Sequence, residues 1–223
     1  MLKRLMIVIM VISGCAPKRT AYNQRNFVLE ASRNRPPQKI SKEIILDVQS
    51  FNVDTTFSTK SLVYRKGPSE YETDFYNQFL IGPDDMITEK TRSWLSESGL
   101  VKLVLEPGSY IDATNMLEGN IIALYGDFRD DSSPKATMKI SIFLIEISDK
   151  SVVFAKTYEA ASEIKSQTAE ALVEAFDNCL RQILTELEKD LIEKLWNFWY
   201  ILKNKKGNYS ENEDDETGKD TWK

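Results

Sequence analysis

The C-terminal half of this 223-residue chain carries a long apolar stripe at helical spacing, over about residues 167–195. Apolar side chains that recur every three or four positions line one face of an α-helix. The members of the stripe are Ala169, Leu172, Val173, Phe176, Leu180, Ile183, Leu184, Leu187 and Leu191. A helix with a single apolar face has to bury that face against another element, such as a sheet. The stripe therefore predicts a long helix that packs on the rest of a domain.

Strand-like segments precede that helix and supply the predicted sheet. The alternation of apolar and polar side chains over 44–53 shifts its phase near Ser50, as a β-bulge would produce. The other segments with strand character are 26–30, 61–66, 100–105, 116–126, 136–147 and 152–160. Residues 148–151, a polar Ser-Asp-Lys-Ser turn, make the last two of these a predicted hairpin.

A second, shorter helix is predicted to begin at Pro83. Proline suits the first helical position, and Asp84 and Asp85 sit favourably at the positive end of the helix dipole. Gly99 is a natural stop. The apolar stripe of this helix would be Ile87, Thr91, Trp94 and Leu95. The expected fold class is α/β (α+β), a single domain with a mixed sheet of about five or six strands packed by two main helices.

The N-terminal fifteen residues have the layout of a bacterial export signal. Lys3 and Arg4 precede an apolar run over 5–12, which is much shorter than the roughly 20 residues that span a bilayer. Residues 12–15, Ile-Ser-Gly-Cys, resemble the lipobox, in which the Cys receives a diacylglyceryl group and the signal is cut just before it. The alternative is an ordinary secretory signal with an incidental Cys. We expect residues 1–14 to be a lipoprotein signal peptide and Cys15 to be the lipid-attachment site, where several acyl chains would anchor stably.

The mature chain is expected to have three parts. Residues 15–42 would hold the lipidated Cys15, a polar tether and a short edge strand, residues 43–202 the folded domain, and residues 203–223 a disordered acidic tail. In Gram-negative bacteria an Asp after the lipidated Cys often signals retention in the inner membrane. Ala16 therefore favours the outer membrane, with the domain facing the periplasm.

Composition removes several classes of function. The chain has no His, so it has no Ser-His-Asp triad and no imidazole zinc ligand. Its two Cys lie far apart and cannot make a four-thiolate site, and no Gly-x-Ser-x-Gly motif occurs. The net charge of −5, or −7 once residues 1–14 are removed, is a poor match for nucleic acid. We expect no catalytic residue, no metal, no cofactor and no nucleic-acid partner.

Five short motifs then follow one another in a recognisable order. They are Leu-Val-Tyr-Arg at 62–65, Tyr-Glu-x-Asp-Phe-Tyr at 71–76, Trp-Leu-x-x-Ser-Gly-Leu at 94–100, Leu-Glu-Gly at 117–119 and Leu-Tyr-Gly-Asp-Phe-Arg at 124–129. Over residues 43 to about 190 the chain resembles the auxiliary lipoproteins of MCE-type ABC lipid transport systems, the paraquat-inducible protein C-like group. The segment 196–223 departs from the resemblance and matches nothing in it.

The resemblance implies a mixed α/β sandwich and a non-catalytic role. It implies that the acylated Cys15 holds the protein on the membrane while the folded domain binds an MCE-domain protein. The complex would dock one end of a lipid conduit for lipid transport and envelope maintenance, with energy supplied by the ABC transporter elsewhere. Two alternatives stay open, a carboxylate-dependent envelope hydrolase and a stand-alone structural lipoprotein. A homo-oligomer also stays open.

Three residues are candidates for partner binding. Tyr64 and Arg65 end a strand beside a loop and would suit an interface, although a core Tyr and an internal ion pair are the alternative. Trp199 lies in the aromatic run 196–202, which either meets a membrane or partner or packs on the sheet. Asp127 is expected to cap a turn rather than to act as a catalytic acid. Cys179 is expected to be a buried, unpaired thiol.

Overall fold

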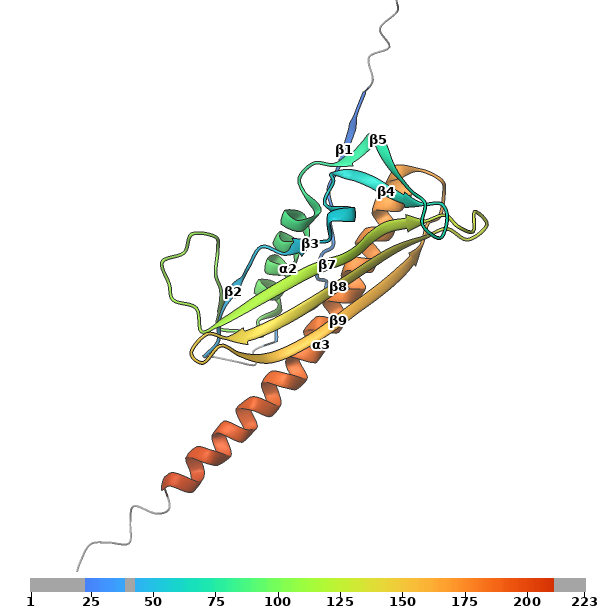
Figure 1. Ribbon diagram of the computed structural model, residues 1–223. Helices are drawn as coiled ribbons and strands as arrows, with labels where there is room; N and C mark the ends of the chain where they lie inside the picture. Colours follow the sequence, from blue (N-terminus) through green and yellow to red (C-terminus); the bar gives the residue numbers. More distant parts are fainter. Residues whose placement is uncertain (1–22, 39–42, 211–223) are drawn as a thin grey trace, which may run out of the picture.

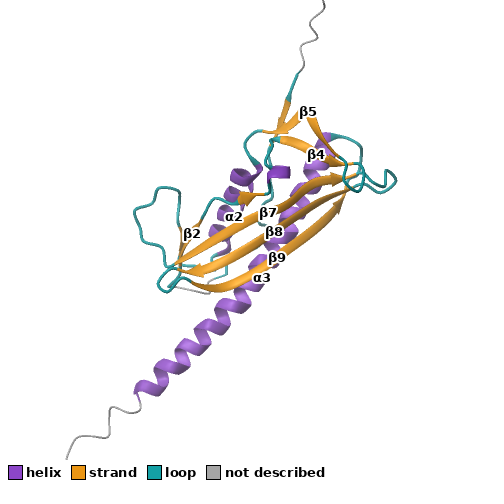
Figure 2. Cartoon of the chain, viewed as in Figure 1, coloured by secondary structure: helices purple, strands orange, loops and turns teal. Residues whose placement is uncertain are grey.

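A mixed sheet forms one layer of the protein, and two helices pack against one of its faces (Figures 1 and 2). The computed structural model describes residues 23–38 and 43–210. The elements run in the order β1 (Arg25–Phe27), β2 (Ile45–Val48), β3 (Asn52–Val53), η2 (Thr55–Phe57), β4 (Ser61–Arg65), β5 (Tyr71–Phe79), α2 (Pro83–Ser98), β6 (Leu103–Val104), β7 (Asn115–Asp127), β8 (Lys135–Glu146), β9 (Ser151–Glu163) and α3 (Ala169–Ser210). The predicted α+β class is confirmed, although the sheet has nine strands.

Three long antiparallel strands, β7, β8 and β9, form one side of the sheet, with β9 at its edge. The predicted hairpin is confirmed, because β8 and β9 pair from Lys135↔Glu163 to Glu146↔Ser151. On its other side β7 receives three short parallel strands, β2, β3 and β4. Antiparallel β5 joins β4, and β1 pairs in parallel with β5 at the outer edge.

The structure amends the strand predictions at two places. The segment 44–53 forms two strands, β2 and β3, that both pair with β7; the three residues between them oppose only two of β7, so the phase shift predicted near Ser50 is present. Phe51 turns into the core between these strands and packs over Gly119, where an added Cβ would lie 2.4 Å from the ring. β5 was not predicted, since its residues face solvent for much of its length and show no clean alternation.

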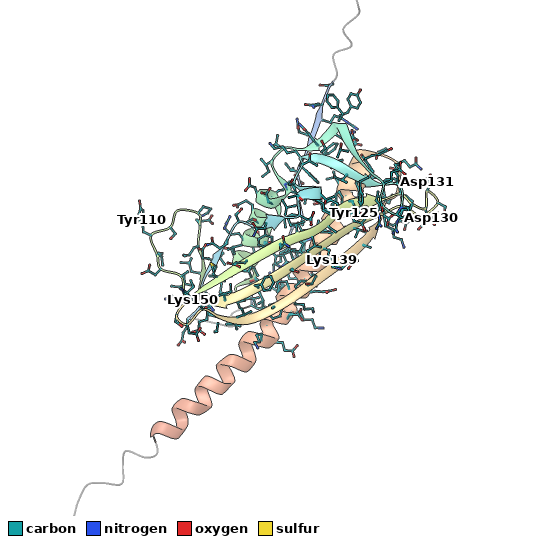
Figure 3. The ribbon with its side chains drawn as sticks, viewed as in Figure 1. Tyr110, Tyr125, Asp130, Asp131, Lys139 and Lys150 are labelled. Carbon is teal, nitrogen blue, oxygen red and sulfur yellow. The ribbon has the colours of Figure 1, made fainter. Side chains whose placement is uncertain are left out.

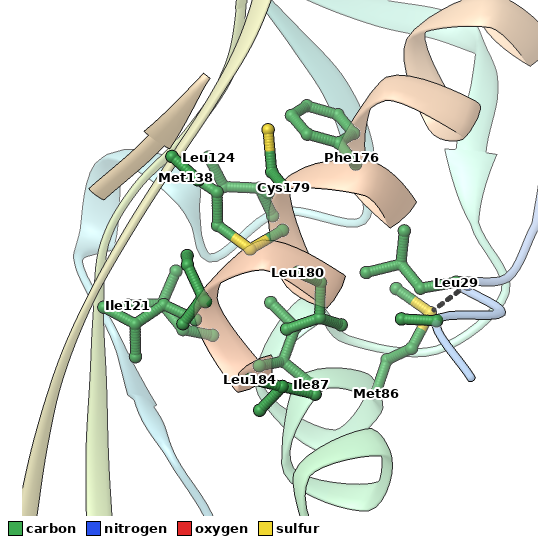
Figure 4. Packing of buried hydrophobic residues seen from close by; sticks show 14 of the residues in the cluster. Leu29, Met86, Ile87, Ile121, Leu124, Met138, Phe176, Cys179, Leu180 and Leu184 are labelled. Carbon is green, nitrogen blue, oxygen red and sulfur yellow. Dashed lines mark hydrogen bonds between the residues drawn. The ribbon is translucent and has the colours of Figure 1, made fainter. Parts of the chain in front are cut away.

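The core lies between the central strands and the two helices (Figure 4). The predicted stripe of α3 is buried throughout, with no member more than 9% exposed. Phe176 packs against Phe79 of β5, and Cys179 is fully buried beside the strands. Burial raises the pKa of the Cys179 thiol to about 12, so this Cys behaves as the small apolar side chain that was predicted.

α2 has the predicted bounds and the predicted caps. Pro83 occupies its first turn together with Asp84 and Asp85, and the helix ends at Gly99, whose φ of 67° is left-handed. The Gln38 carbonyl also approaches Gly99 closely, and a Cβ would lie 2.8 Å from that oxygen. This is a second reason why the position favours glycine. The four residues of the predicted stripe are buried.

α3 continues well past its predicted end near Leu195. It extends to Ser210, and its 42 residues give a length of about 63 Å. Residues 203–210, which were predicted to belong to a disordered tail, are therefore helical, and residues 211–223 lie outside the described residues. The last turns project beyond the sheet (Figure 1). Among the described helices, none is both long and apolar enough to span a bilayer.

Candidate docking surface

Tyr64, at the end of β4, is held by contacts within the domain. Its hydroxyl donates a 2.8 Å hydrogen bond to Asp74 of β5, and its ring meets Phe128 edge-on at 5.5 Å. Burial, followed by the bond to Asp74, raises the pKa of Tyr64. Burial alone would raise the pKa of Asp74, but hydrogen bonds from Asn77, Tyr64 and backbone amides hold it below its usual range.

Arg65 fastens the loop between β4 and β5. Its guanidinium donates to the carbonyls of Gly67 and Pro68, at 3.3 and 2.9 Å. The same group lies 5.6 Å from the ring centroid of Tyr71 and 5.7 Å from that of Tyr125. Among the described residues Arg65 forms no ion pair of the kind considered as an alternative, and its carbonyl and ring contacts are structural.

Three of the five sequence motifs meet at this end of the sheet. Arg65 is paired with Tyr71 across β4 and β5 and with Asp127 across β4 and β7, so the motifs at 62–65, 71–76 and 124–129 are adjacent. These three motifs therefore belong to one packed cluster around Arg65. Partner binding through Tyr64 and Arg65 stays a prediction. Trp199 lies on the far part of α3, and Cys15 lies outside the described residues, so their roles also stay predictions.

Asp127 acts in a turn, as predicted. It accepts the backbone N–H of Arg129 at 3.2 Å and forms an ion pair with the Arg129 guanidinium at 2.6 Å. The hydrogen bond from Arg129 lowers the pKa of Asp127, which makes this carboxylate a weak general base at neutral pH. Both residues line a hollow of about 350 Å³ near the labelled Asp130 and Asp131 in Figure 3.

The described part of the chain offers no group of three or more Cys, Asp and Glu placed to hold a metal ion. Its most buried ion pair stabilises the fold and does not open onto a reactive site. Arg33 forms a bidentate pair with Glu188 at 2.8 and 2.9 Å, and both side chains are 1% exposed. Trp94 of α2 also donates to Glu188, at 2.8 Å. These contacts join the segment after β1 to both helices.

The most exposed large apolar side chain among the described residues lies on the loop between β6 and β7. Tyr110, at the apex of residues 105–114, is fully exposed, and Ile111 beside it is 52% exposed (Figure 3). The loop is folded rather than extended, because Ser109 donates its N–H to Glu106 and Gly108 adopts a φ of 78°. This backbone holds an aromatic side chain out in solvent, where it has no packing partner to stabilise it.

The hairpin between β8 and β9 adds two more exposed apolar side chains beside this loop. The N–H of Ile147 donates to the carbonyl of Thr114 at 3.0 Å, which links the two loops. Ile147 and Ile111 line the same hollow of about 460 Å³, and Val152 across the hairpin is 58% exposed. We call the four side chains Tyr110, Ile111, Ile147 and Val152 the tip surface.

Carboxylates surround the tip surface. Asp47, Glu106 and Asp112 line the hollow together with Ile111 and Ile147. An apolar centre with a charged rim is the common layout of a protein interface. Sequence reasoning missed this surface, although Pro-Gly-Ser-Tyr-Ile at 107–111 offered a signal. An aromatic and a branched apolar residue directly after a Pro-Gly turn belong to neither a strand nor a helix pattern.

Comparisons with known proteins identify the fold. No protein-family model matches the sequence, and no curated protein matches it. The structure of protein XCC0632 from Xanthomonas campestris, of the family model DUF330, is 21% identical with a TM-score of 0.63, over 78% of this chain and 95% of that chain. A second, described only as an uncharacterized protein, is 10% identical with a TM-score of 0.58, over 76% of this chain and 99% of that one.

A more distant likeness, at 10% identity and a TM-score of 0.37, is to lipoprotein GNA1162 from Neisseria meningitidis. It covers 64% of this chain and 99% of that chain. At these levels of identity structural likeness speaks to the fold and not to activity. The chain has the α+β fold of the DUF330 protein XCC0632.

Proposed function

We propose that this protein is a lipid-anchored, non-catalytic component of the bacterial envelope that docks an MCE-domain protein of an ABC lipid transport system at the outer membrane. The motif order along 62–129 supports this proposal, and so does the α+β fold that the resemblance implied. The observation that carries it is the tip surface, where the exposed Ile111 and Ile147 line one hollow and a fully exposed Tyr110 precedes Ile111 on the loop.

Tyr110 is a tyrosine held in water rather than in the core. A Tyr in water gains little by staying there, whereas in an interface it buries a large area at small entropic cost. The adjoining hollow lets a partner side chain enter between Ile111 and Ile147. Tyr110 is therefore the residue that we expect to dominate binding, with the aliphatic side chains excluding water around it.

The position of the tip surface suits a docking role. It lies where β7 begins, whereas β4, which carries β5 on its other side, pairs with the Asp127 end of that strand, twelve residues away. This spacing corresponds to roughly 40 Å along the sheet. β1, through which the chain from Cys15 enters the domain, lies on the outer side of β5 (Figure 1). Anchor and docking surface would thus be well separated, and a partner could approach without meeting the membrane.

The carboxylates around the hollow indicate the chemistry of the partner surface. An apolar anchor ringed by Lys or Arg would be complementary to Asp47, Glu106 and Asp112. Such rim charges mainly raise the association rate and are screened by salt. Binding should therefore weaken at high ionic strength without being abolished.

Titration of a cognate MCE-domain protein with the mature Cys15→Ser chain tests the docking proposal. Tyr110→Ala should reduce the affinity by about thirtyfold, since loss of an interface anchor costs about 2 kcal/mol. Tyr76→Ala is the matched control, because Tyr76 is also exposed but lies on β5. Absence of association at tens of micromolar, or an equal loss for both variants, would contradict the proposal.

Intact-mass analysis of the protein from bacterial membranes tests the anchor. The expected product begins at Cys15 and carries a diacylglyceryl group there. Cys15→Ser should remain an unprocessed precursor or leave the membrane fraction. A mature protein that starts at another residue, or that has an unmodified Cys15, would refute the lipid attachment.

A further inference from the structure

Two exposed aromatic side chains lie side by side on β5. Phe75 is 65% exposed and Tyr76 is 45% exposed. Their ring centroids are 5.4 Å apart and the rings are nearly perpendicular, so the two rings contact each other edge to face. Neither belongs to the core, to the cluster around Arg65 or to the tip surface. We call Phe75 and Tyr76 the aromatic pair.

The aromatic pair lies where the chain from the anchor enters the domain. The Gln24 side chain donates to the Phe75 carbonyl at 3.2 Å, and Arg25 pairs with Asn77 in the β1–β5 ladder. Figure 1 shows β1 and β5 together at one end of the molecule. The first residues of the described chain are thus fixed directly beside the two rings.

The distance to the lipid is limited by the length of the intervening chain. Seven residues separate Cys15 from Asn23, the first described residue. Even fully extended, this segment reaches at most about 29 Å. Because Gln24 touches Phe75, the aromatic pair is within tether reach of the bilayer that would hold the acyl chains. The tip surface lies farther along the sheet from this entry point.

Charge and further apolar surface favour the same contact. Residues 16–29 contain Lys18, Arg19 and Arg25 and no acidic residue, in a mature chain of net charge −7. Arg25 also forms an ion pair with Glu170, so Lys18 and Arg19 are the charges left to attract a membrane. Basic segments next to a membrane are attracted to anionic headgroups by about 1 kcal/mol for each Lys or Arg. Exposed aliphatic side chains follow at the ends of β1 and β5, namely Val28, Leu80 and Ile81.

We propose that the aromatic pair rests in the headgroup region of the anionic bilayer that carries the Cys15 lipid, an inference that rests on the lipid attachment proposed above. Aromatic rings are favoured at this depth, where an apolar ring and a polar edge are both satisfied. The lipid and the aromatic pair make two separate contacts with the same surface. Two contacts restrict the orientation of the domain, so that the tip surface points away from the membrane.

The test uses the full mature, lipidated chain in vesicles of phosphatidylethanolamine and phosphatidylglycerol. Phe75→Cys is labelled with a nitroxide, and Tyr110→Cys, also solvent-exposed but on the tip surface, is the matched control. Cys179 should not react because it is buried and its pKa is raised to about 12. An unchanged melting temperature shows that each variant is folded. The readout is relaxation of the label by lipid-soluble oxygen and by a water-soluble nickel complex.

The label at position 75 should respond more to oxygen than to nickel, and the label at position 110 should show the reverse. Equal exposure to nickel at both positions, with the Cys15 lipid verified by intact mass, would overturn the membrane contact and leave the proposed anchor standing. An unmodified Cys15 in the same sample would refute the proposed anchor and the membrane contact together.

Discussion

Glu188 of α3 accepts hydrogen bonds from Arg33 and from the indole of Trp94 in a site that is closed to water. Arg33 in turn donates to the carbonyls of Arg35 and Pro36, so one guanidinium fixes the path of the segment after β1. A charge removed from water is tolerated only when it is paired and hydrogen-bonded, and here both conditions are met. The segment after β1 is thereby tied into the core of the domain.

We predict that Glu188→Gln destabilises the protein severely. Gln keeps the size of the side chain but leaves the Arg33 charge buried without a counter-charge, which costs about 3–5 kcal/mol. Glu186→Gln, on the exposed face of the same helix, is the matched control and should change stability little. Urea unfolding measures both. Similar midpoints for the two variants would show that the Arg33–Glu188 pair contributes little to the fold.

The same pair predicts a loss of stability in acid. Burial alone would raise the pKa of Glu188, but hydrogen bonds from Arg33 and Trp94 and the Arg33 charge hold it below its ordinary value. A carboxylate with a lowered folded-state pKa contributes stability that is present above its unfolded pKa, about 4.3. That contribution is lost as the pH falls from there through the folded pKa. The free energy of unfolding should drop across this window, and Glu188→Gln should drop less.

α3 combines a packed part and a projecting part. Its buried stripe ends at Leu191, yet the helix continues to Ser210. Stability should therefore be concentrated before residue 192. The projecting part carries the aromatic run 196–202 and points past the end of the sheet where the tip surface lies (Figure 1).

We predict that the two parts of α3 respond differently to change. Leu187→Ala, at a fully buried position, should cost about 2–5 kcal/mol because it leaves a cavity. Deletion of residues 203–223 should leave the melting temperature within about 2–4 °C, which is roughly 1 kcal/mol for a chain of this size. Calorimetry distinguishes the cases. A larger drop on deletion would mean that the last turns pack on the domain.

Local periodicity explains which elements the sequence predicted. The α3 stripe, the α2 caps and strands β7 to β9 repeat at their own period, so each is visible within its own segment. β5 was missed because both of its faces are largely exposed and no alternation marks it. The Arg33–Glu188 pair was missed because its partners lie 155 residues apart. The helical residues 203–210 were missed because they are polar, and a helix needs no apolar face where it projects.

The predicted site residues show the same limit. Cys179 and Asp127 follow from their neighbours in sequence and were predicted correctly. Tyr64 and Arg65 were chosen for their residue type at a strand end. In the structure Tyr64 binds Asp74, and Arg65 contacts the ring of Tyr71 and nearby carbonyls. Which exposed residues share a surface depends on strand order. The tip surface combines the loop at 105–114 with the hairpin at 147–152, and no local sequence pattern places these two segments side by side.

At the scale of the whole molecule, the protein has two differently equipped ends. One carries β1, the entry of the chain from Cys15 and the aromatic pair, and the other carries the tip surface within an acidic rim. The buried Arg33–Glu188 pair ties the first end to both helices. This arrangement is that of a spacer, which would hold a docking surface at a set distance from a membrane.

Photo-crosslinking in intact envelopes tests the central claim most directly. A photoreactive phenylalanine analogue replaces Tyr110, and the same analogue at Phe143, an exposed aromatic position on β8, is the control. We predict an adduct between position 110 and an MCE-domain protein, identified by mass spectrometry, and none from position 143. Adducts that join position 110 only to a second copy of this chain, or to no MCE-domain protein, would contradict the account.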